Sequence, residues 1–320
     1  MIRPKALGPS SRVAVIAPSG RVVKTRVEAG LDCLRSMGFE PVLGDHVFKS
    51  HLHQAGVDDE RLSDLIWALT DPDIDGVICA RGGEGATSLL PWLESARVVP
   101  RVFCGYSDVT ALHAWLQRNG WVTFHGPMVA VEMANDAFDM DSFIGEVTGV
   151  RTDHSIPVRL LKTGQAEGVL SGGCLSLLAA LAGTEWTLPW SGRSVLLIED
   201  TNEPPYKLHR MLTQLRDSHS LRDVQGIIFG TMSKCEAEAE DGFTLDEILL
   251  DALKGFEGPI GIGLALGHGE GRTLTLPLGT RVLLSPEDPP QGSPAPDSIL
   301  RGRLHLTELG VIEDSMIVDE

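Results

Sequence analysis

The chain has 320 residues, a hydrophobic fraction of 42% and a formal net charge of −17 at pH 7. This composition is typical of a globular protein, and the length allows two domains with substantial cores. The negative charge argues against nucleic acid or an anionic membrane as the main partner, because both bind basic surfaces.

The cysteines and the N-terminal segment indicate a reducing, cytoplasmic setting. The five cysteines are an odd number and form no C-x-x-C motif, so neither a disulfide framework nor a zinc site is expected. The apolar run 13–17 is too short for a signal peptide, and no stretch is long enough to span a bilayer. His51 and His53 lack further ligands at metal-binding spacing, so we expect a solvated loop there and no metal.

Strands alternate with helices through the first half of the chain. Apolar runs predict strands at 12–17, 39–43, 76–80, 98–104 and 121–124, and helical periodicity predicts helices at 25–37, 58–69, 86–93 and after Ser107. This order predicts an α/β domain with a parallel, doubly wound, Rossmann-like sheet over residues 1–135. Sites in such sheets form at the carboxyl ends of the strands, where the loops 17–20, 81–85 and 105–108 are expected.

The second half has a different organisation. An acidic, loop-like stretch predicts an interdomain linker at 136–164. Short strands with few helices follow, and they predict a smaller, β-rich, barrel-like domain over residues 165–320. Within that domain, 273–276 and 281–284 are predicted to form a hairpin, and the Pro-rich segment 286–298 a flexible excursion.

Ser107 is the first candidate for a catalytic side chain. It follows an apolar strand and precedes an amphipathic helix, which is the arrangement of a nucleophile elbow. The N-terminus of that helix would offer N–H groups to a developing oxyanion. On this stretch alone, Ser107 or Asp108 as a simple helix cap is the favoured interpretation, because caps are common and Val109 replaces the second glycine of G-x-S-x-G.

The Gly82-Gly83-x-Gly85 loop lies between a predicted strand and a predicted helix. A phosphate cradle must be considered at such a place. The loop does not match the dinucleotide fingerprint, however, and no Gly-Lys-Ser/Thr follows, so no nucleotide cofactor is expected. The alternative is close approach of the glycine backbone to an oxyanion.

A serine nucleophile needs a base and an acid that orients the base. Glu199 follows the predicted strand 193–198, where it is either a structural acid or the orienting acid. His268 lies between two glycines, where it is either a turn residue or the base. His125, at the end of a predicted strand near the Ser107 edge, is the second choice for the base, and His113 is expected to be structural.

The chain resembles the LD-carboxypeptidases, the serine peptidase family that also contains the microcin C immunity proteins. The resemblance runs from Val13 to about Leu284. It rests on seven segments in one order: AVIAPSG, ARGGEGATSLLPWL, GYSDVTALH, HGPM, LSGGCLSLLAALAGT, LLIEDTNEPPYKLHRMLTQL and GHGEGRTLTLPLG.

The resemblance implies roles for particular residues. Ser107 is similar to the nucleophile, Glu199 to the orienting acid and His268 to the base. The backbone N–H groups of Asp108 and Gly83 would form the oxyanion hole. The implied enzyme is a homodimer that needs no metal and removes the terminal D-alanine from murein tetrapeptides during peptidoglycan recycling.

Two positions depart from the family pattern, and they leave other functions open. Glu84 stands where the family has tyrosine, and Cys174 where it often has asparagine. Arg81 and Arg272 are the nearest cations by motif for a substrate carboxylate. An aminoacyl- or peptidyl-nucleotide is the alternative substrate, and a non-catalytic ligand-binding protein and a nicotinamide-dependent oxidoreductase are the alternative classes.

Overall fold

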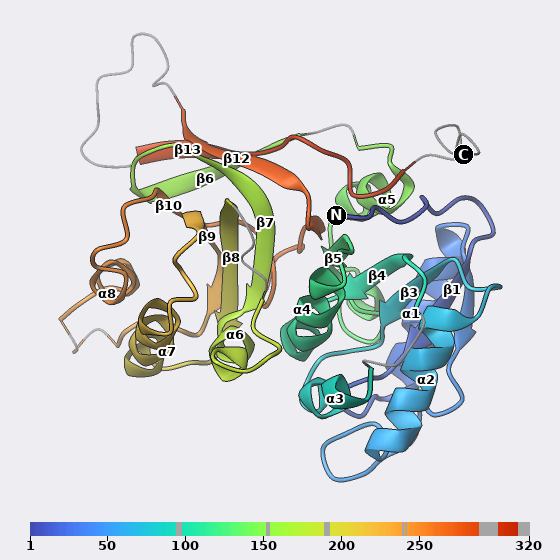
Figure 1. The fold of residues 1–320 in the computed structure, drawn as a ribbon. Helices are drawn as coiled ribbons and strands as arrows, with labels where there is room; N and C mark the ends of the chain where they lie inside the picture. Colours follow the sequence, from blue (N-terminus) through green and yellow to red (C-terminus); the bar gives the residue numbers. More distant parts are fainter. Residues whose placement is uncertain are drawn as a thin grey trace. The chain divides into compact units, whose positions relative to one another are not determined.

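The computed structural model describes residues 1–93, 98–151, 154–188, 193–238, 240, 242–287 and 300–312. Two compact units are formed (Figure 1). The first comprises Met1–Thr152, Glu270–Gly279 and Leu309–Glu320, and the second comprises Asp153–Gly269 and Thr280–Glu308. Within the described ranges, no helix combines the length and the apolar character that crossing a membrane requires.

A six-stranded sheet forms the centre of the first unit, in the order β11-β5-β4-β3-β1-β2. The strands are β1 (Arg12–Ile16), β2 (Glu40–Leu43), β3 (Gly76–Cys79), β4 (Val102–Gly105), β5 (Thr123–His125) and β11 (Leu276–Leu278). The pairs from β2 through β5 are parallel, and β11 pairs antiparallel with β5. The predicted parallel sheet is therefore confirmed, with one antiparallel strand added at its edge.

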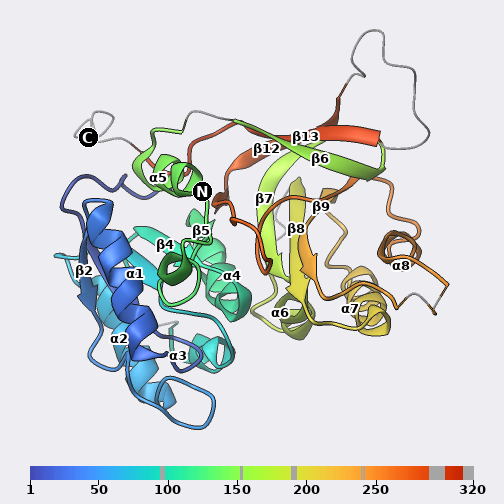
Figure 2. The same cartoon turned by 180° about the vertical axis from the view of Figure 1, so that it is seen from behind.

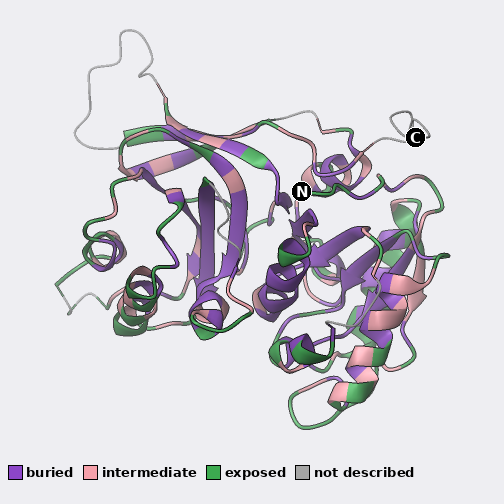
Figure 3. Ribbon diagram, in the orientation of Figure 1, coloured by how far each residue is buried: buried purple, intermediate pink, exposed green. Residues whose placement is uncertain are grey.

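Helices cover both faces of this sheet (Figures 1 and 2). The helical elements of the unit are α1 (Lys24–Ser36), α2 (Asp58–Thr70), η1 (Ala86–Leu89), α3 (Leu90–Leu93), η2 (Ser107–Val109), α4 (Thr110–Arg118), η3 (Met133–Asn135) and α5 (Met140–Thr148). Apolar residues of α1 and α5 share one core with alternate residues of β1 and β4. The remaining strand residues face α2 and α4, which is why β1, β3 and β4 are apolar along most of their length (Figure 3).

The second unit is a closed barrel of seven strands in the order β10-β6-β13-β12-β7-β8-β9. The strands are β6 (Ser155–Lys162), β7 (Ala166–Cys174), β8 (Ser194–Thr201), β9 (Val224–Ser233), β10 (Ile260–Ile262), β12 (Arg281–Pro286) and β13 (Leu300–Leu306). The chain passes through α6 (Leu175–Leu181) between β7 and β8 and through α7 (Pro205–Asp217) between β8 and β9, and both strand pairs are parallel. Helix α8 (Leu245–Ala252) precedes β10. The barrel-like second domain is confirmed.

The segment 136–164, expected to be a linker, contains helix α5 and strand β6. Its acidic residues had suggested a loop, but the Asp139 carboxylate caps α5 by accepting a hydrogen bond from Ser142 N at 2.8 Å. Phe143 and Val147 of that helix are fully buried. The compact units consequently divide near residue 152, and the expected boundaries at 135 and 165 do not coincide with them.

The hairpin expected around Pro277-Leu278-Gly279 does not form. Strand β11 belongs to the sheet of the first unit, and β12 belongs to the barrel of the second. Gly279 has φ +97° and lies where the chain passes from one unit to the other. Most of the Pro-rich segment 286–298 lies outside the described residues, which end at Glu287 and resume at Leu300.

Candidate active site

Ser107 occupies a strained turn between β4 and α4. Its φ of +65° lies in the left-handed region, which a residue with a side chain adopts rarely and mostly where the surrounding structure requires it. Tyr106 immediately before it is extended, with φ −159°, so the chain changes direction abruptly at Ser107. A strand, a strained serine and a helix in succession are the arrangement of a nucleophile elbow.

Asp108 does not cap its own helix through its side chain. Its buried carboxylate accepts a hydrogen bond from Ala86 N at 2.8 Å and so caps the neighbouring element η1. Burial raises the pKa of Asp108, and the hydrogen bond from Ala86 opposes that shift. The side chain thereby ties the serine turn to the end of the glycine loop.

The glycine loop lies directly against Ser107. A Cβ atom at Gly82 would lie 2.8 Å from Ser107 Cβ and 2.9 Å from Ser107 Oγ, so no side chain fits there. The Gly82 carbonyl accepts a hydrogen bond from Gly20 N at 3.0 Å, and Gly83 has φ +122°. The backbone of the loop therefore packs directly against Ser107 with no side chain between them. Such an arrangement lets backbone N–H groups come close to a reacting group.

Arg61 holds this loop, and sequence reasoning did not single it out. The side chain is 1% exposed, and its Nη1 atom donates to the carbonyls of Pro18 at 2.5 Å and Gly85 at 2.8 Å. Nη2 contacts the Asp58 carboxylate and the Ser88 hydroxyl. A Cβ at Gly85 would lie 2.7 Å from Nη1, so the glycine leaves room for the guanidinium.

A second buried acid supports the strand side of the turn. Glu132 accepts hydrogen bonds from the Tyr106 hydroxyl at 2.6 Å and from Met128 N at 2.9 Å. The Tyr106 ring also lies beside that of His125, with 5.4 Å between the centroids. Tyr106 is thus fixed on both sides immediately before Ser107.

His113 and His125 are both fully buried. The Nε2–H of His113 donates to the Gly105 carbonyl at 2.8 Å, and burial lowers the pKa of His113 to about 3. This geometry fits the expected structural role of His113. His125, the second choice for the base, lies at the end of β5 and is 0% exposed.

Glu199 and His268 form a close pair in the second unit. Strand β8 continues through Glu199, which is 0% exposed. The distance between His268 Nδ1 and Glu199 Oε2 is 2.8 Å, and the backbone N of His268 lies 3.2 Å from the same oxygen. A carboxylate accepts only, so Nδ1 carries the hydrogen, and Nε2 of the neutral ring is the nitrogen that can take up a proton.

Glycines make room for this pair. Gly267 has φ +90°, and a Cβ there would overlap with Glu199 Oε2. A Cβ at Gly230 would lie 3.1 Å from Glu199 Cβ. The carboxylate is therefore enclosed by backbone, and the turn at Gly267 brings the imidazole of His268 onto it.

The motif around Cys174 supports the strand that carries Glu199. Cys174 pairs with Glu199 in the register of β7 and β8, and burial raises the pKa of its thiol well above the usual range. Asp200 accepts hydrogen bonds from Ser176 N and Thr201 N, both at 2.8 Å. Burial also raises the pKa of Asp200. Because burial raises its pKa, the Cys174 thiol is a packed, protonated group.

The charged residues expected to bind substrate are exposed. Arg81 Nη1 donates to the Arg21 carbonyl at 3.1 Å. Glu84 Oε1 accepts from Gln54 Nε2 at 3.3 Å. Arg272 forms an ion pair with Asp136 at 2.6 Å, so an acid already compensates its charge. Across the described ranges, no group of three or more His, Cys, Asp or Glu side chains is placed to hold a metal ion.

Comparisons with known proteins show the family of the chain. A family model described as the LD-carboxypeptidase N-terminal domain matches residues 13–126, and one described as the LD-carboxypeptidase C-terminal domain matches residues 167–284. A putative carboxypeptidase of Streptomyces coelicolor is 40% identical over 292 residues, which are 87% of this chain and 92% of the relative.

Two further comparisons concern proteins with named ligands or activities. A murein tetrapeptide carboxypeptidase of Pseudomonas aeruginosa is 34% identical over 273 residues, which are 81% of this chain and 88% of that protein. The solved structure of the microcin C7 self-immunity protein MccF in complex with aspartyl sulfamoyl adenosine superposes with a TM-score of 0.81 at 22% identity, covering 98% of this chain and all of that one. The second comparison shows a shared fold.

Proposed function

The chain belongs to the LD-carboxypeptidase family and is a serine peptidase of that family, and we propose that it removes the terminal D-alanine from murein tetrapeptides. The bond hydrolysed is then the L,D amide bond. The 2.8 Å hydrogen bond between His268 and the buried Glu199 carries this proposal, because it gives a histidine the tautomer of a general base. The similarity to a murein tetrapeptide carboxypeptidase supports the choice of substrate.

In the proposed mechanism, Ser107 Oγ attacks the carbonyl carbon of the scissile bond while His268 Nε2 takes the hydroxyl proton. Glu199 orients the imidazole and stabilises the imidazolium. The carbonyl oxygen becomes an oxyanion and receives hydrogen bonds from the N–H groups of Asp108 and Gly83. Collapse of the intermediate breaks the C–N bond, and the imidazolium protonates the leaving D-alanine amine. Water then hydrolyses the acyl-enzyme with the same base.

Several contacts of the first unit support these roles. The φ of +65° at Ser107 is the backbone strain expected of an exposed nucleophile at a turn. The hydrogen bond that Ala86 N donates to Asp108 and the bonds that Arg61 donates fix the loop that would supply the second N–H donor. Preorganised donors of this kind are worth about 10²–10³ in kcat each.

An exopeptidase also needs a cation for the terminal carboxylate of its substrate. Between the two candidates, we favour Arg81, because it lies next to the glycine loop and has no carboxylate partner within the described part of the chain. Arg272 is compensated by Asp136. Glu84 would lie on the same loop as Arg81 and limit the affinity for an anionic group.

The test is incubation of the purified protein with a murein tetrapeptide ending in D-alanine, followed by mass spectrometry. Wild type should release one alanine, and Ser107→Ala should lower the rate by about 10³-fold or more. Ser142→Ala, on helix α5, makes the same chemical change away from the serine turn, so this variant serves as the matched control and should retain activity. Full turnover by Ser107→Ala would show that another residue is the nucleophile.

A peptidyl- or aminoacyl-nucleotide is the alternative substrate. The fold shared with MccF, whose complex contains aspartyl sulfamoyl adenosine, favours it as the second candidate. The same assay with that compound distinguishes the two: release of aspartate without release of alanine from the tetrapeptide would replace the murein proposal. We further propose a cytoplasmic homodimer, which light scattering would detect as twice the 34.5 kDa mass of the chain.

A further inference from the structure

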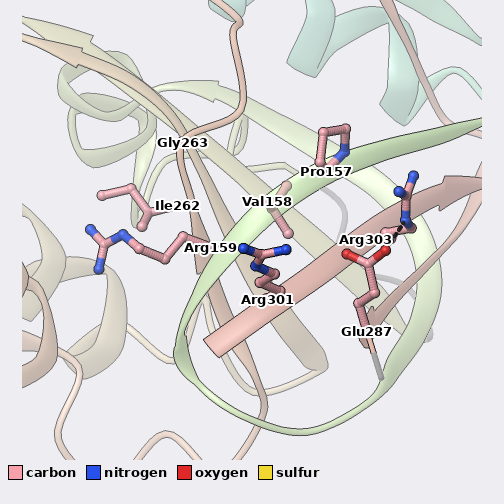
Figure 4. Close-up of a pocket in the computed structure, with 8 residues that line it drawn as sticks. All are labelled: Pro157, Val158, Arg159, Ile262, Gly263, Glu287, Arg301 and Arg303. Carbon is pink, nitrogen blue, oxygen red and sulfur yellow. Dashed lines mark hydrogen bonds and ion pairs between the residues drawn. The ribbon is translucent and has the colours of Figure 1, made fainter. Parts of the chain in front are cut away.

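Three arginines lie on one face of two neighbouring barrel strands. Arg301 and Arg303 are on β13 and Arg159 is on β6. The antiparallel register places Arg301 directly opposite Arg159. The intervening residues Val158 and Gly302 are buried, so the arginines belong to the outer, solvent-facing side of the barrel. Figure 4 shows the three side chains around one cavity.

Like charges directly opposite each other destabilise a strand pair. Two carboxylates reduce this repulsion in part. Arg159 makes a two-point ion pair with Asp246, with distances of 2.7 and 2.9 Å, and Arg303 pairs with Glu287 at 3.0 Å. Arg301 has no ion pair with any residue that the structure describes. Among the described residues, the Arg301 guanidinium therefore has no compensating acid, in a chain whose net charge is −17.

The arginines line a cavity of about 460 Å³, which is the size of a small-molecule site. Its wall also includes the carboxylate residue Glu287, already paired with Arg303, and the apolar residues Pro157, Val158 and Ile262. A Cβ at Gly263, on the rim, would meet nothing within 4 Å, so the space beside the arginines is open there. The cavity thus combines a local positive charge with apolar surface.

We propose that this face of the barrel binds a small organic phosphate, a ligand that the carboxypeptidase reaction does not require. The planar fork of Arg301 matches the geometry of phosphate oxygens, and a phosphate dianion reduces the repulsion between Arg301 and Arg159, whose own fork is engaged by Asp246. The apolar wall then contacts the organic part of the ligand, which favours a phosphate ester over inorganic phosphate. This inference does not rest on the proposed function.

The test is isothermal titration calorimetry of the full chain with phenyl phosphate, at constant ionic strength set with chloride. Wild type should bind it saturably and more tightly than inorganic phosphate. Arg301→Gln should weaken binding by about tenfold or more, which corresponds to about 1.4 kcal/mol. Asp246→Asn should strengthen it, because this substitution removes the acid that compensates Arg159.

Arg281→Gln is the matched control. Arg281 is an exposed arginine on the adjacent strand β12, already paired with Glu167 at 3.1 Å, so the variant makes the same change in net charge outside the cavity. Its affinity should equal that of wild type. Absence of saturable binding, or equal weakening by Arg281→Gln and Arg301→Gln, would overturn the site. Equal affinities for the two phosphates would overturn the assignment of an organic ligand.

Discussion

At the scale of single residues, Gly267 sets the position of the proposed base. Its φ of +90° is costly for any residue with a side chain, and its missing Cβ is the space that Glu199 Oε2 occupies. His268 follows directly, so a shift of the turn would move Nδ1 away from the carboxylate. A base that loses its orienting hydrogen bond loses the tautomer needed for catalysis.

Gly267→Ala should therefore lower kcat by about 10²-fold or more, with a smaller change in KM. Gly263→Ala provides the control, because Gly263 has nearly the same φ of +92° but open space around the added Cβ. Both variants carry a similar backbone strain, but Gly267→Ala adds the overlap with Glu199 Oε2, so it should lose more stability on thermal unfolding than Gly263→Ala. Equal activity in the two would mean that the position of His268 does not depend on the glycine.

His113 predicts a pH dependence of stability. Its pKa is about 3 in the folded protein and about 6.5 in an unfolded chain. Between these values the unfolded state binds the proton and the folded state does not, so acidification from pH 6.5 towards 3 favours unfolding, by at most about 1.4 kcal/mol per pH unit. Above pH 6.5 this residue contributes no pH dependence.

Urea unfolding at several pH values measures this contribution. His113→Gln keeps a donor for the Gly105 carbonyl but does not titrate, so the difference in unfolding free energy between wild type and variant should change between pH 6.5 and pH 4 and stay constant above pH 7. Asp108 and Asp200 have raised pKa values and act in the opposite direction as the pH falls, but they are common to both proteins. A pH-independent difference would show that His113 takes up its proton as readily in the folded as in the unfolded state.

At the scale of elements, Arg61 connects segments that are far apart in the sequence. The guanidinium bonds the loop after β1 through Pro18 and the glycine loop after β3 through Gly85. Arg61→Lys keeps the charge but supplies a single nitrogen in place of the planar fork. The carbonyl of Gly85 then keeps the Ser88 hydroxyl as a donor but loses the guanidinium, and the glycine loop loses one of its fixed points beside Ser107.

Arg61→Lys should lower kcat by about tenfold to a hundredfold and the unfolding free energy by about 2–4 kcal/mol. Arg101→Lys is the control for stability alone. Arg101 is also buried and donates to the carbonyls of Ala68, Asp71 and Ile74, at the opposite ends of the strands from the glycine loop. The Arg101→Lys variant should lose a similar amount of unfolding free energy and keep the kcat of wild type. Equal losses of kcat in the two variants would mean that Arg61 affects activity only through the stability of the fold.

Helix α2 also shows what the sequence could predict and what it could not. Periodicity located the helix to within one residue, because the spacing of apolar residues indicates where a helix begins and ends. Helical spacing places Leu62 and Ile66 on one apolar face with Leu65 and Leu69, yet Leu62 and Ile66 are only half-buried, while Arg61 and Asp64 are buried. The rotation follows from the carbonyls of distant loops that Arg61 satisfies, and no local pattern records such partners. Glu132 was missed for the same reason.

Glu199 and His268 could be named as candidates because each is next to a feature that the sequence displays, and the family resemblance implied their roles. Glu199 ends an apolar run, and His268 lies between glycines.

The division between the units could not be predicted in the same way. Strand β11 is only three residues long and pairs with β5 across about 150 positions of sequence, so its partner depends on the tertiary fold. From local sequence alone, a hairpin between 273–276 and 281–284 was the expected pairing.

At the scale of the whole molecule, the net charge of −17 opposes an anionic substrate. Its field reaches about 30 Å at 10 mM salt and about 8 Å at 150 mM. A murein tetrapeptide carries free carboxylates, so its encounter with the enzyme should be slower at low ionic strength. Once the substrate is bound, the contacts around the reacting bond are short and salt screens them little.

Raising sodium chloride from 10 to 150 mM should therefore increase kcat/KM for the tetrapeptide by about twofold to fivefold and leave kcat unchanged. A tetrapeptide whose side-chain carboxylates are amidated should show a smaller increase, because the field acts on fewer charges. Steady-state rates at four salt concentrations provide the measurement. A decrease in kcat/KM would mean that local cations such as Arg81 attract the substrate more strongly than the whole chain repels it, and Arg81→Gln should then abolish the salt dependence.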